Sequence, residues 1–405
     1  MREEHHTFAV MSDPVIIASA ARTPLGSLLG SLAPLTASQL GAHALRAALE
    51  RAQANPEDVS EVLMGCVLPA GQGQAPARQA ARRAGLPDSV GATTVNKVCG
   101  SGMKAIMLGH DLLLAGSADL VAAGGMESMS NAPHLVKKAR AGLRMGDVAL
   151  ADHMMLDGLE DAYEPGRPMG DFGEVVAQAY QFSRGDQDAY ATESLVRARN
   201  AITAGDFAAE IEGLTVPDRK GEKRVENDEH PFKVSPEKIP ALKPAFRPDG
   251  TITAASASVN ADGAAALVLA RRSTAQAKGL PILAEIKAHA THAQEPHLYA
   301  TAPIPAIRKV LAKAGWTTGE VDLFEINEAF ALVAMAAAKE LGIPRDRLNI
   351  HGGACALGHP IGASGARIVV TLLHALRQRG LSRGVACLCI GGGEATALAI
   401  EIPQA

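Results

Sequence analysis

The 405-residue sequence predicts an α/β protein built from two similar halves. Short apolar runs alternate with helical stretches, a pattern typical of parallel strands covered by helices on both faces. Three short segments of the first half also recur in the second half, at a spacing of about 260 residues. A nearly constant spacing over three separate matches indicates duplication of one α/β unit.

The first half reads as strands and helices in alternation. The expected strands are the apolar runs 15–20, 62–68, 93–98 and 120–125. The expected helices are 36–51, with Thr36 or Ser38 as N-cap, 74–84, which ends at Gly85, and 103–115. This order predicts parallel pairing and a sheet with helices on both faces.

A segment of different texture separates the halves. It is rich in Met, Pro, Gly and charged residues, has little strand signal, and contains its clearest helix at 183–204. An apolar strand at 264–270 follows it. We therefore expect an N-terminal half at 13–127 plus 250–275, an inserted, mostly helical and loop segment at 128–249, and a C-terminal half at 281–405.

The repeated segments indicate where the two halves meet. Residues 101–106 match 364–369, residues 57–62 match 319–324, and residues 84–87 match 341–344. Two such halves packed face to face would bring Ser101 and Ser364 near a common pseudo-twofold axis. We therefore expect one active site built from both halves.

Composition excludes several classes of protein. The net charge of −4 gives no argument for a nucleic-acid partner. Five cysteines, an odd number, argue against a disulfide scaffold and fit a reducing compartment. No charge-free apolar run is long enough to span a bilayer, and residues 1–12 lack the apolar core of a secretory signal. We expect a cytoplasmic protein without membrane partners, whose first ten residues are a candidate upstream extension.

The stretch 95–106 predicts a strand-to-helix elbow. Cys99 ends an extended run, a Gly-Ser-Gly triplet follows it, and a long run of helix formers comes next. A thiol at the start of a helix lies near unpaired backbone N–H groups and the positive end of the helix dipole, which both favour the reactive thiolate. On spacing alone, a buried structural cysteine explains the pattern equally well.

Further motifs stand before and after the elbow along the chain. They are Arg22-Thr23-Pro24, Gly125 to Met129, Asp262 to Ala266, Asn327 to Phe330, Gly358-His359-Pro360-Ile361-Gly362 and Cys389 to Gly393. With the elbow, these motifs resemble the thiolase family from about Pro14 to the C-terminus. The resemblance implies the thiolase fold, with two duplicated α/β halves in a layered αβαβα arrangement and an inserted CoA-binding segment.

The resemblance also implies an acyl transferase that reversibly condenses two acyl-CoA molecules to 3-ketoacyl-CoA and CoA through an acyl-cysteine. Cys99 would be the nucleophile. His359 would raise its thiolate fraction and donate to a thioester oxygen, for which Asn327 would fix a water as second donor. Cys389 would move a proton at the acetyl methyl group. Backbone N–H groups of Cys99 and Gly391 would hold the oxyanion of the acyl enzyme.

Substrate contacts and partners are implied in the same way. Ser258, Met169 and Phe330 match residues beside the pantetheine arm and the acyl group. Coenzyme A is a substrate and product, and neither a metal nor a resident cofactor is implied. The family pattern further implies a homodimer or homotetramer.

Two other functions on the same fold have less support. A decarboxylating ketoacyl synthase has no second catalytic cysteine, so Cys389 argues against it. A non-catalytic acyl-CoA or lipid-binding protein would be expected to lack at least one of Cys99, Asn327, His359 and Cys389, and all four are present.

Three residue sets have more ordinary interpretations. His351 is an alternative to His359, although a structural role is expected for it. Cys66 and Cys355 have no basic neighbour in sequence and are expected in the core. Cys387 and Cys389 lie on one face of a strand, but nothing else clusters with them to complete the roughly four ligands of a structural zinc site.

Overall fold

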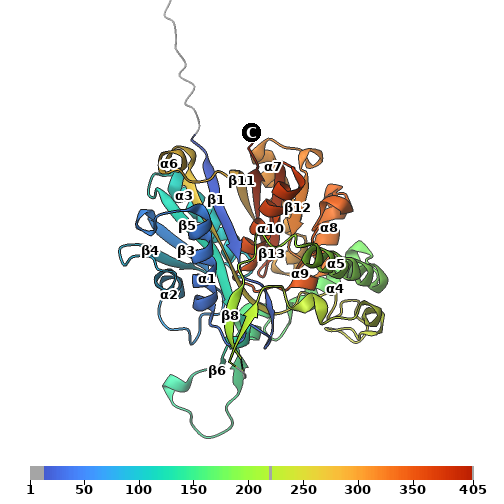
Figure 1. Ribbon diagram of the computed structural model, residues 1–405. Helices are drawn as coiled ribbons and strands as arrows, with labels where there is room; N and C mark the ends of the chain where they lie inside the picture. Colours follow the sequence, from blue (N-terminus) through green and yellow to red (C-terminus); the bar gives the residue numbers. More distant parts are fainter. Residues whose placement is uncertain (1–12, 219–220, 404–405) are drawn as a thin grey trace, which may run out of the picture.

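The computed structural model describes residues 13–218 and 221–403, and the expectation about the first ten residues lies outside them. One mixed sheet runs through both halves, in the order β12-β13-β14-β11-β1-β10-β5-β3-β4 (Figure 1). The first half provides β1 (Val15–Arg22), β3 (Glu61–Gly65), β4 (Gly91–Val95), β5 (Leu120–Ser128) and β10 (Ala261–Arg271). The second half provides β11 (Ala284–Ala293), β12 (Leu323–Ile326), β13 (Arg383–Ile390) and β14 (Glu394–Glu401).

The strand order repeats between the halves, which supports the duplication. The sequence β3-β5-β10-β1 of the first half corresponds to β12-β13-β14-β11 of the second. Strand β4 pairs in parallel with β3, and in the second half a single parallel bridge between Phe324 and Leu348 takes the same position. The two copies join where Ile16 and Ile17 of β1 pair with Glu285 and Ala284 of β11.

The expectation of parallel pairing is right for only part of the sheet. Strand β3 is parallel to β4 and β5, and β12 is parallel to β13. Strand β10, however, is antiparallel to both β1 and β5, and β14 is antiparallel to β11 and β13. The short turn Gly391–Gly393 joins β13 directly to β14, and so short a connection permits only antiparallel pairing.

Helices cover the two parts of the sheet and fill the space between them, giving the predicted αβαβα layers. The central layer is α3 (Ser101–Leu114) beside α10 (Ser364–Arg379), which contact strands of both halves. Helix α1 (Ala37–Ala52) covers β1, β5 and β10 from outside, with α2 (Pro76–Arg83) beside it. Helix α7 (Pro303–Ala314), with α8 (Ala331–Leu341) beside it, covers the second half.

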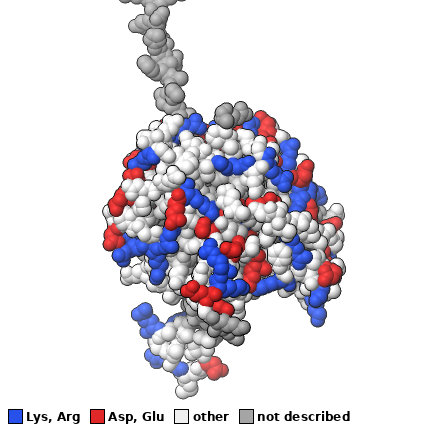
Figure 2. All heavy atoms as spheres, viewed as in Figure 1, with Lys and Arg blue, Asp and Glu red and all other residues white. Residues whose placement is uncertain are grey.

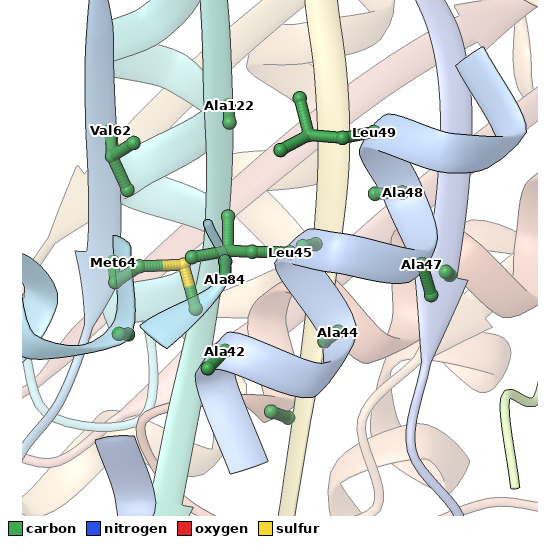
Figure 3. Close-up of a cluster of buried hydrophobic side chains, with 14 of the residues drawn as sticks. Ala42, Ala44, Leu45, Ala47, Ala48, Leu49, Val62, Met64, Ala84 and Ala122 are labelled. Atoms are coloured by element: carbon green, nitrogen blue, oxygen red, sulfur yellow. The ribbon is translucent and has the colours of Figure 1, made fainter. Parts of the chain in front are cut away.

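The core under α1 shows why the sequence folds in this way. Thr36 caps the helix through a capping box with Gln39, as its position in the sequence predicts. Leu45 and Leu49 project from one side of α1 toward Met64 and its neighbours on the sheet (Figure 3). Burial of each such side chain contributes roughly 2 kcal/mol, and the alanines between them let the helix approach the strands closely.

The inserted segment contains elements that the sequence signals poorly. Helix α5 (Arg184–Ala204) is the predicted one, whereas α4 (Met169–Tyr180) was not expected, because its glycines 170 and 173 lower helix propensity. Two hairpins were also missed. They are β6 (His134–Val136) with β7 (Leu150–Asp152), and β8 (Leu214–Asp218) with β9 (Gly221–Val225). Their strands are short and largely exposed, so they show little apolar pattern.

The surface adds two general observations. Lysine and arginine side chains alternate with aspartate and glutamate on the face shown in Figure 2, in keeping with the small net charge. The β6–β7 hairpin and its loop project away from the body of the molecule (Figure 1). Within the described ranges, we find no helix with the length and apolar character that a membrane crossing demands.

Candidate active site

A cavity of about 260 Å³ lies where the two halves and the inserted segment come together. Seven of the residues singled out from the sequence line it: Cys99, Met169, Ser258, Phe330, His359, Cys389 and Gly391. These residues come from stretches spread over nearly three hundred positions of the chain. Asn327, the other residue expected to take part in catalysis, is buried but does not line the cavity.

Cys99 is held at the cavity by a strained elbow between β4 and α3. Val98 has a φ of 46°, a left-handed conformation that is a genuine outlier for a β-branched residue. Ser101, the first residue of α3, donates from Oγ to the carbonyl of Val98 at 2.6 Å and accepts from the N–H of Lys97 at 2.8 Å. The serine thereby fixes the turn, and the thiol of Cys99 stays partly accessible.

The electrostatics of Cys99 differ from the sequence-based expectation. Burial raises the pKa of its thiol to about 11, although the backbone N–H groups of Gly391 and Cys99 itself act in the opposite direction. The carboxylate of Glu127 also raises this pKa. The sequence reveals the favourable helix start but not how far the folded chain buries the thiol. The thiol is therefore neutral at pH 7 and needs a base to react.

His359 supplies a group of the right kind. Its Nδ1 lies 2.5 Å from Oγ of Ser364, and this hydroxyl donates to the carbonyl of Pro360 at 2.9 Å. Burial, with a smaller effect of Arg367, lowers the pKa of His359 to about 3, so the ring is neutral at pH 7. Its Nε2 is buried and makes no hydrogen bond to any described residue. A neutral ring with an unpaired nitrogen, on the same cavity as a thiol, can accept a proton.

Cys389 lies near the end of β13 and lines the same cavity as Cys99. Burial raises the pKa of its thiol well above the ordinary value, and the nearby Cys99 adds to this rise. Gly391 follows in the turn to β14, and its backbone N–H points at the sulfur of Cys99. Two thiols of raised pKa and one neutral imidazole thus line one cavity.

Asn327 lies just after β12, behind the cavity wall. Its N–H donates to the carbonyl of Cys387 at 2.9 Å, which places it one strand away from Cys389. Both polar atoms of its side chain are buried without a hydrogen-bond partner among the described residues. A buried amide with both ends unpaired is costly, so it is available to hold a water or a substrate oxygen.

The apolar wall of the cavity includes residues that sequence reasoning missed. Phe246 and Tyr299 both lie edge-on to Phe330, with ring centroids 5.8 and 6.4 Å apart. The hydroxyl of Tyr299 donates to the carbonyl of Met169 at 3.0 Å, which anchors the start of α4. Aromatic residues make up only 3% of the sequence, so their positions are the one signal in the sequence that could have pointed to this wall.

Two buried glutamates tie the loops of the site together. Glu127, at the end of β5, accepts from the N–H groups of Val67 at 2.9 Å and Leu68 at 3.2 Å, and from Gly362 in the His359 loop at 2.9 Å. Glu328 accepts from Tyr190, Ser194, Asn349 and the N–H of Cys355. Both carboxylates therefore position backbone around the cavity.

The remaining candidates lie elsewhere. His351 pairs with Asp206 at 3.4 Å, packs against Phe207 and does not line the cavity, which supports the structural role expected for it. Cys66, Cys355 and Cys387 are buried and make weak hydrogen bonds to nearby oxygens.

Comparisons with known proteins agree along the whole chain. Two family models match, one described as Thiolase, N-terminal domain, over residues 15–273 and one described as Thiolase, C-terminal domain, over residues 280–402. A protein of Chromobacterium violaceum named acetyl-CoA acetyltransferase is 49% identical over 96% of this chain and 100% of its own. A mouse protein named cytosolic acetyl-CoA acetyltransferase is also 49% identical, over 96% of this chain and 98% of its own.

Proposed function

Since the chain belongs to the thiolase family, we infer that it is an acetyl-CoA acetyltransferase, which reversibly condenses acetyl-CoA with a second acyl-CoA to give 3-ketoacyl-CoA and free CoA. The observation that carries this proposal is the shared cavity of Cys99, His359 and Cys389. The relatives bear the name of this activity and give no support to a decarboxylating synthase or a non-catalytic binding protein.

In the first half-reaction, the sulfur of Cys99 attacks the thioester carbonyl and the carbon–sulfur bond to CoA breaks. Nε2 of His359 takes the thiol proton, because its lone pair is free when Nδ1–H donates to Ser364. Cys389 gives its proton to the departing CoA sulfur, which leaves a thiolate at Cys389. The N–H groups of Cys99 and Gly391 are placed to hold the carbonyl oxygen as it gains charge.

In the second half-reaction, the thiolate of Cys389 removes a proton from the methyl group of acetyl-CoA. The protonated His359 donates from Nε2 to the thioester oxygen of the resulting enolate, and a water on Asn327 would be the second donor. The enolate carbon then attacks the acyl carbonyl and Cys99 leaves, recovering its proton from His359. Every proton is accounted for, and no resident cofactor or metal takes part.

The walls of the cavity fit an acyl-CoA substrate. Met169, Phe246 and Phe330 give the acyl group an apolar surface, and Ser258 lies at the same wall. Because Met169 and Phe246 belong to residues 128–249, their position supports the proposal that this inserted segment holds the CoA arm. The division of the chain at 13–127 plus 250–275, 128–249 and 281–405 remains a proposal.

We also propose that the chain works as a homodimer or homotetramer in the cytoplasm. Strand β4 is an exposed edge of the sheet, and unpaired edges favour pairing with another chain. The projecting β6–β7 hairpin exposes Leu143, Met145 and Leu150. The five free cysteines fit a reducing compartment. Light scattering coupled to size exclusion checks the assembly, and a monomer at micromolar concentration would contradict it.

The activity itself is tested with 3-ketoacyl-CoA substrates of graded length. Acetoacetyl-CoA and CoA should yield acetyl-CoA, and the series gives the acyl-length preference. Absence of turnover at every length by a folded protein would refute the proposal. Condensation that requires malonyl-CoA instead of acetyl-CoA would favour the decarboxylating alternative.

A further inference from the structure

Away from the cavity, three side chains of metal-binding type converge between the halves. His110 and Asp111 lie on α3, and His289 lies on β11. Nδ1 of His110 is 3.2 Å from Nε2 of His289, and Oδ1 of Asp111 is 2.9 Å from that Nε2 and 3.2 Å from that Nδ1. The two imidazole rings meet edge to face, with centroids 4.9 Å apart.

Hydrogen bonding can satisfy this triangle with one proton, because the N–H of one ring can be shared between the carboxylate oxygen and the nitrogen of the other ring. With both ring nitrogens protonated, the two N–H groups would face each other at 3.2 Å. A cation at the apex, in contrast, uses a lone pair from all three atoms. In a tetrahedral site with bonds of about 2.0 Å, neighbouring ligand atoms lie about 3.3 Å apart. The observed separations are close to this value.

We propose that His110, Asp111 and His289 form a binding site for a divalent zinc-class ion. Two imidazoles and one carboxylate suit Zn²⁺, whereas Mg²⁺ and Ca²⁺ prefer oxygen ligands. The histidine side chains are only 13% and 16% exposed, whereas Asp111 is 52% exposed and leaves room for a water as fourth ligand. Lys313 is a nearby positive charge that would repel a cation, but its ammonium donates to the carbonyl oxygen of His289.

The position of the site suggests what the ion does. Helix α3 belongs to the first half and starts at the Cys99 elbow, whereas β11 is the first strand of the second half. A bound ion therefore links the two copies of the duplicated unit outside the cavity, because none of the three ligands lines it. The site departs from the sequence-based expectation of no metal, and it takes no part in the proposed reaction.

The test uses zinc and cobalt with the full chain. The parent carries alanine at positions 5 and 6, because adjacent histidines there would also bind such ions. We expect one high-affinity Zn²⁺ per chain by calorimetry, and a Co²⁺ spectrum without the charge-transfer absorption of a thiolate ligand. Zinc at about 100 times its Kd should raise the melting temperature by about 3 °C.

Matched variants decide the outcome. His289→Ala and Asp111→Asn should each lose the bound ion and the shift in melting temperature. His292→Ala, on the same strand and bonded to Gln294 instead, should keep both. Asp111 is the most exposed ligand, so its variant decides the matter if His289→Ala does not fold. Equal zinc binding by parent and Asp111→Asn, a thiolate-type cobalt spectrum, or no binding at submillimolar zinc would overturn the proposal.

Discussion

The starts of α3 and α10 have the same local structure but hold different functional side chains. Each helix begins with Ser-Gly, at Ser101 in the first half and Ser364 in the second, and the helices lie side by side in the central layer. In both copies the serine hydroxyl donates to a carbonyl of the preceding loop, that of Val98 at 2.6 Å and that of Pro360 at 2.9 Å.

The second contact of the serine differs between the two copies, and each serine therefore supports a different residue of the site. Ser101 accepts from the backbone N–H of Lys97 and so shapes the turn that presents the Cys99 thiol. Ser364 contacts the ring of His359 and so sets its orientation. One copy of the duplicated unit holds the proposed nucleophile and the other holds its base, which explains why neither half can form the site alone.

The largest expected effect comes from replacing either of the two cysteines of the cavity. Cys99→Ser should lower turnover at least about 10³-fold and abolish acyl-enzyme formation, because the alcohol is a much weaker nucleophile here. Cys389→Ser should lose turnover similarly but still form the acyl enzyme. Mass spectrometry detects acylation, and NMR detects exchange of the acetyl methyl protons in D₂O. Loss of acylation in both variants would contradict the division of roles.

Glu127 joins the loop of Val67 and Leu68 to the loop that contains Gly362. The protonation of its carboxyl group gives a test through the pH dependence of stability. Burial raises the pKa of its carboxyl from 4.5 to about 7 in the folded chain. The folded state therefore binds an extra proton between these values, so stability should fall as pH rises from about 4.5 to about 7, by up to about 3 kcal/mol. In urea denaturation, Glu127→Gln should reduce the dependence of the unfolding free energy on pH. A smaller dependence should remain, because burial also raises the pKa of Glu325, to about 8. An unchanged dependence would refute the assignment.

The serine pair gives the most direct test of the comparison. Ser364→Ala should lower kcat about 10- to 100-fold with the acyl-CoA KM little changed, because His359 loses the partner that fixes its tautomer. Ser101→Ala should mainly lower stability, because the strained turn loses the two hydrogen bonds that hold it. Melting curves and steady-state kinetics of both variants separate the two effects. Equal kinetic defects with equal stability losses would mean that both serines act only as helix starts.

The smallest effect concerns the contact between the helices. A Cβ added at Gly102 would lie 2.9 Å from the backbone nitrogen of Ala366 in α10. Gly102→Ala should therefore cost about 1 to 2 kcal/mol, since the clash outweighs the gain in helix propensity. Gly185, also second in its helix, has only a side-chain atom at 3.6 Å, so Gly185→Ala should be neutral or stabilising. Chemical denaturation measures both, and equal values would argue against close packing.

The sequence predicted what local patterns and repeats can encode. The match of residues 101–106 with 364–369 indicated that these two segments correspond, and they are the starts of α3 and α10. The family resemblance indicated Cys99, His359 and Cys389, which the fold brings to one cavity. The antiparallel direction of β10 and β14 was missed, because strand direction depends on connections and not on apolar pattern.

Other properties depend on contacts between distant segments. The net rise in the pKa of Cys99 follows from burial, which no helix-start motif reports. The contact of Ser364 with His359 and the triangle of His110, Asp111 and His289 need side-chain positions that only the folded chain provides. The motif identified Asn327 as a candidate, but its side chain lies behind the wall and does not line the cavity.

The central claim is that His359 of the second half activates Cys99 of the first, and the alkylation rate of Cys99 tests it most directly. Iodoacetamide labelling followed by mass spectrometry should be roughly 10²-fold slower in His359→Ala than in the unmodified protein at pH 7. The difference should narrow as pH approaches about 11, where the thiol ionises without help. Equal rates at pH 7 would contradict the account, because Cys99 would then be reactive without its base.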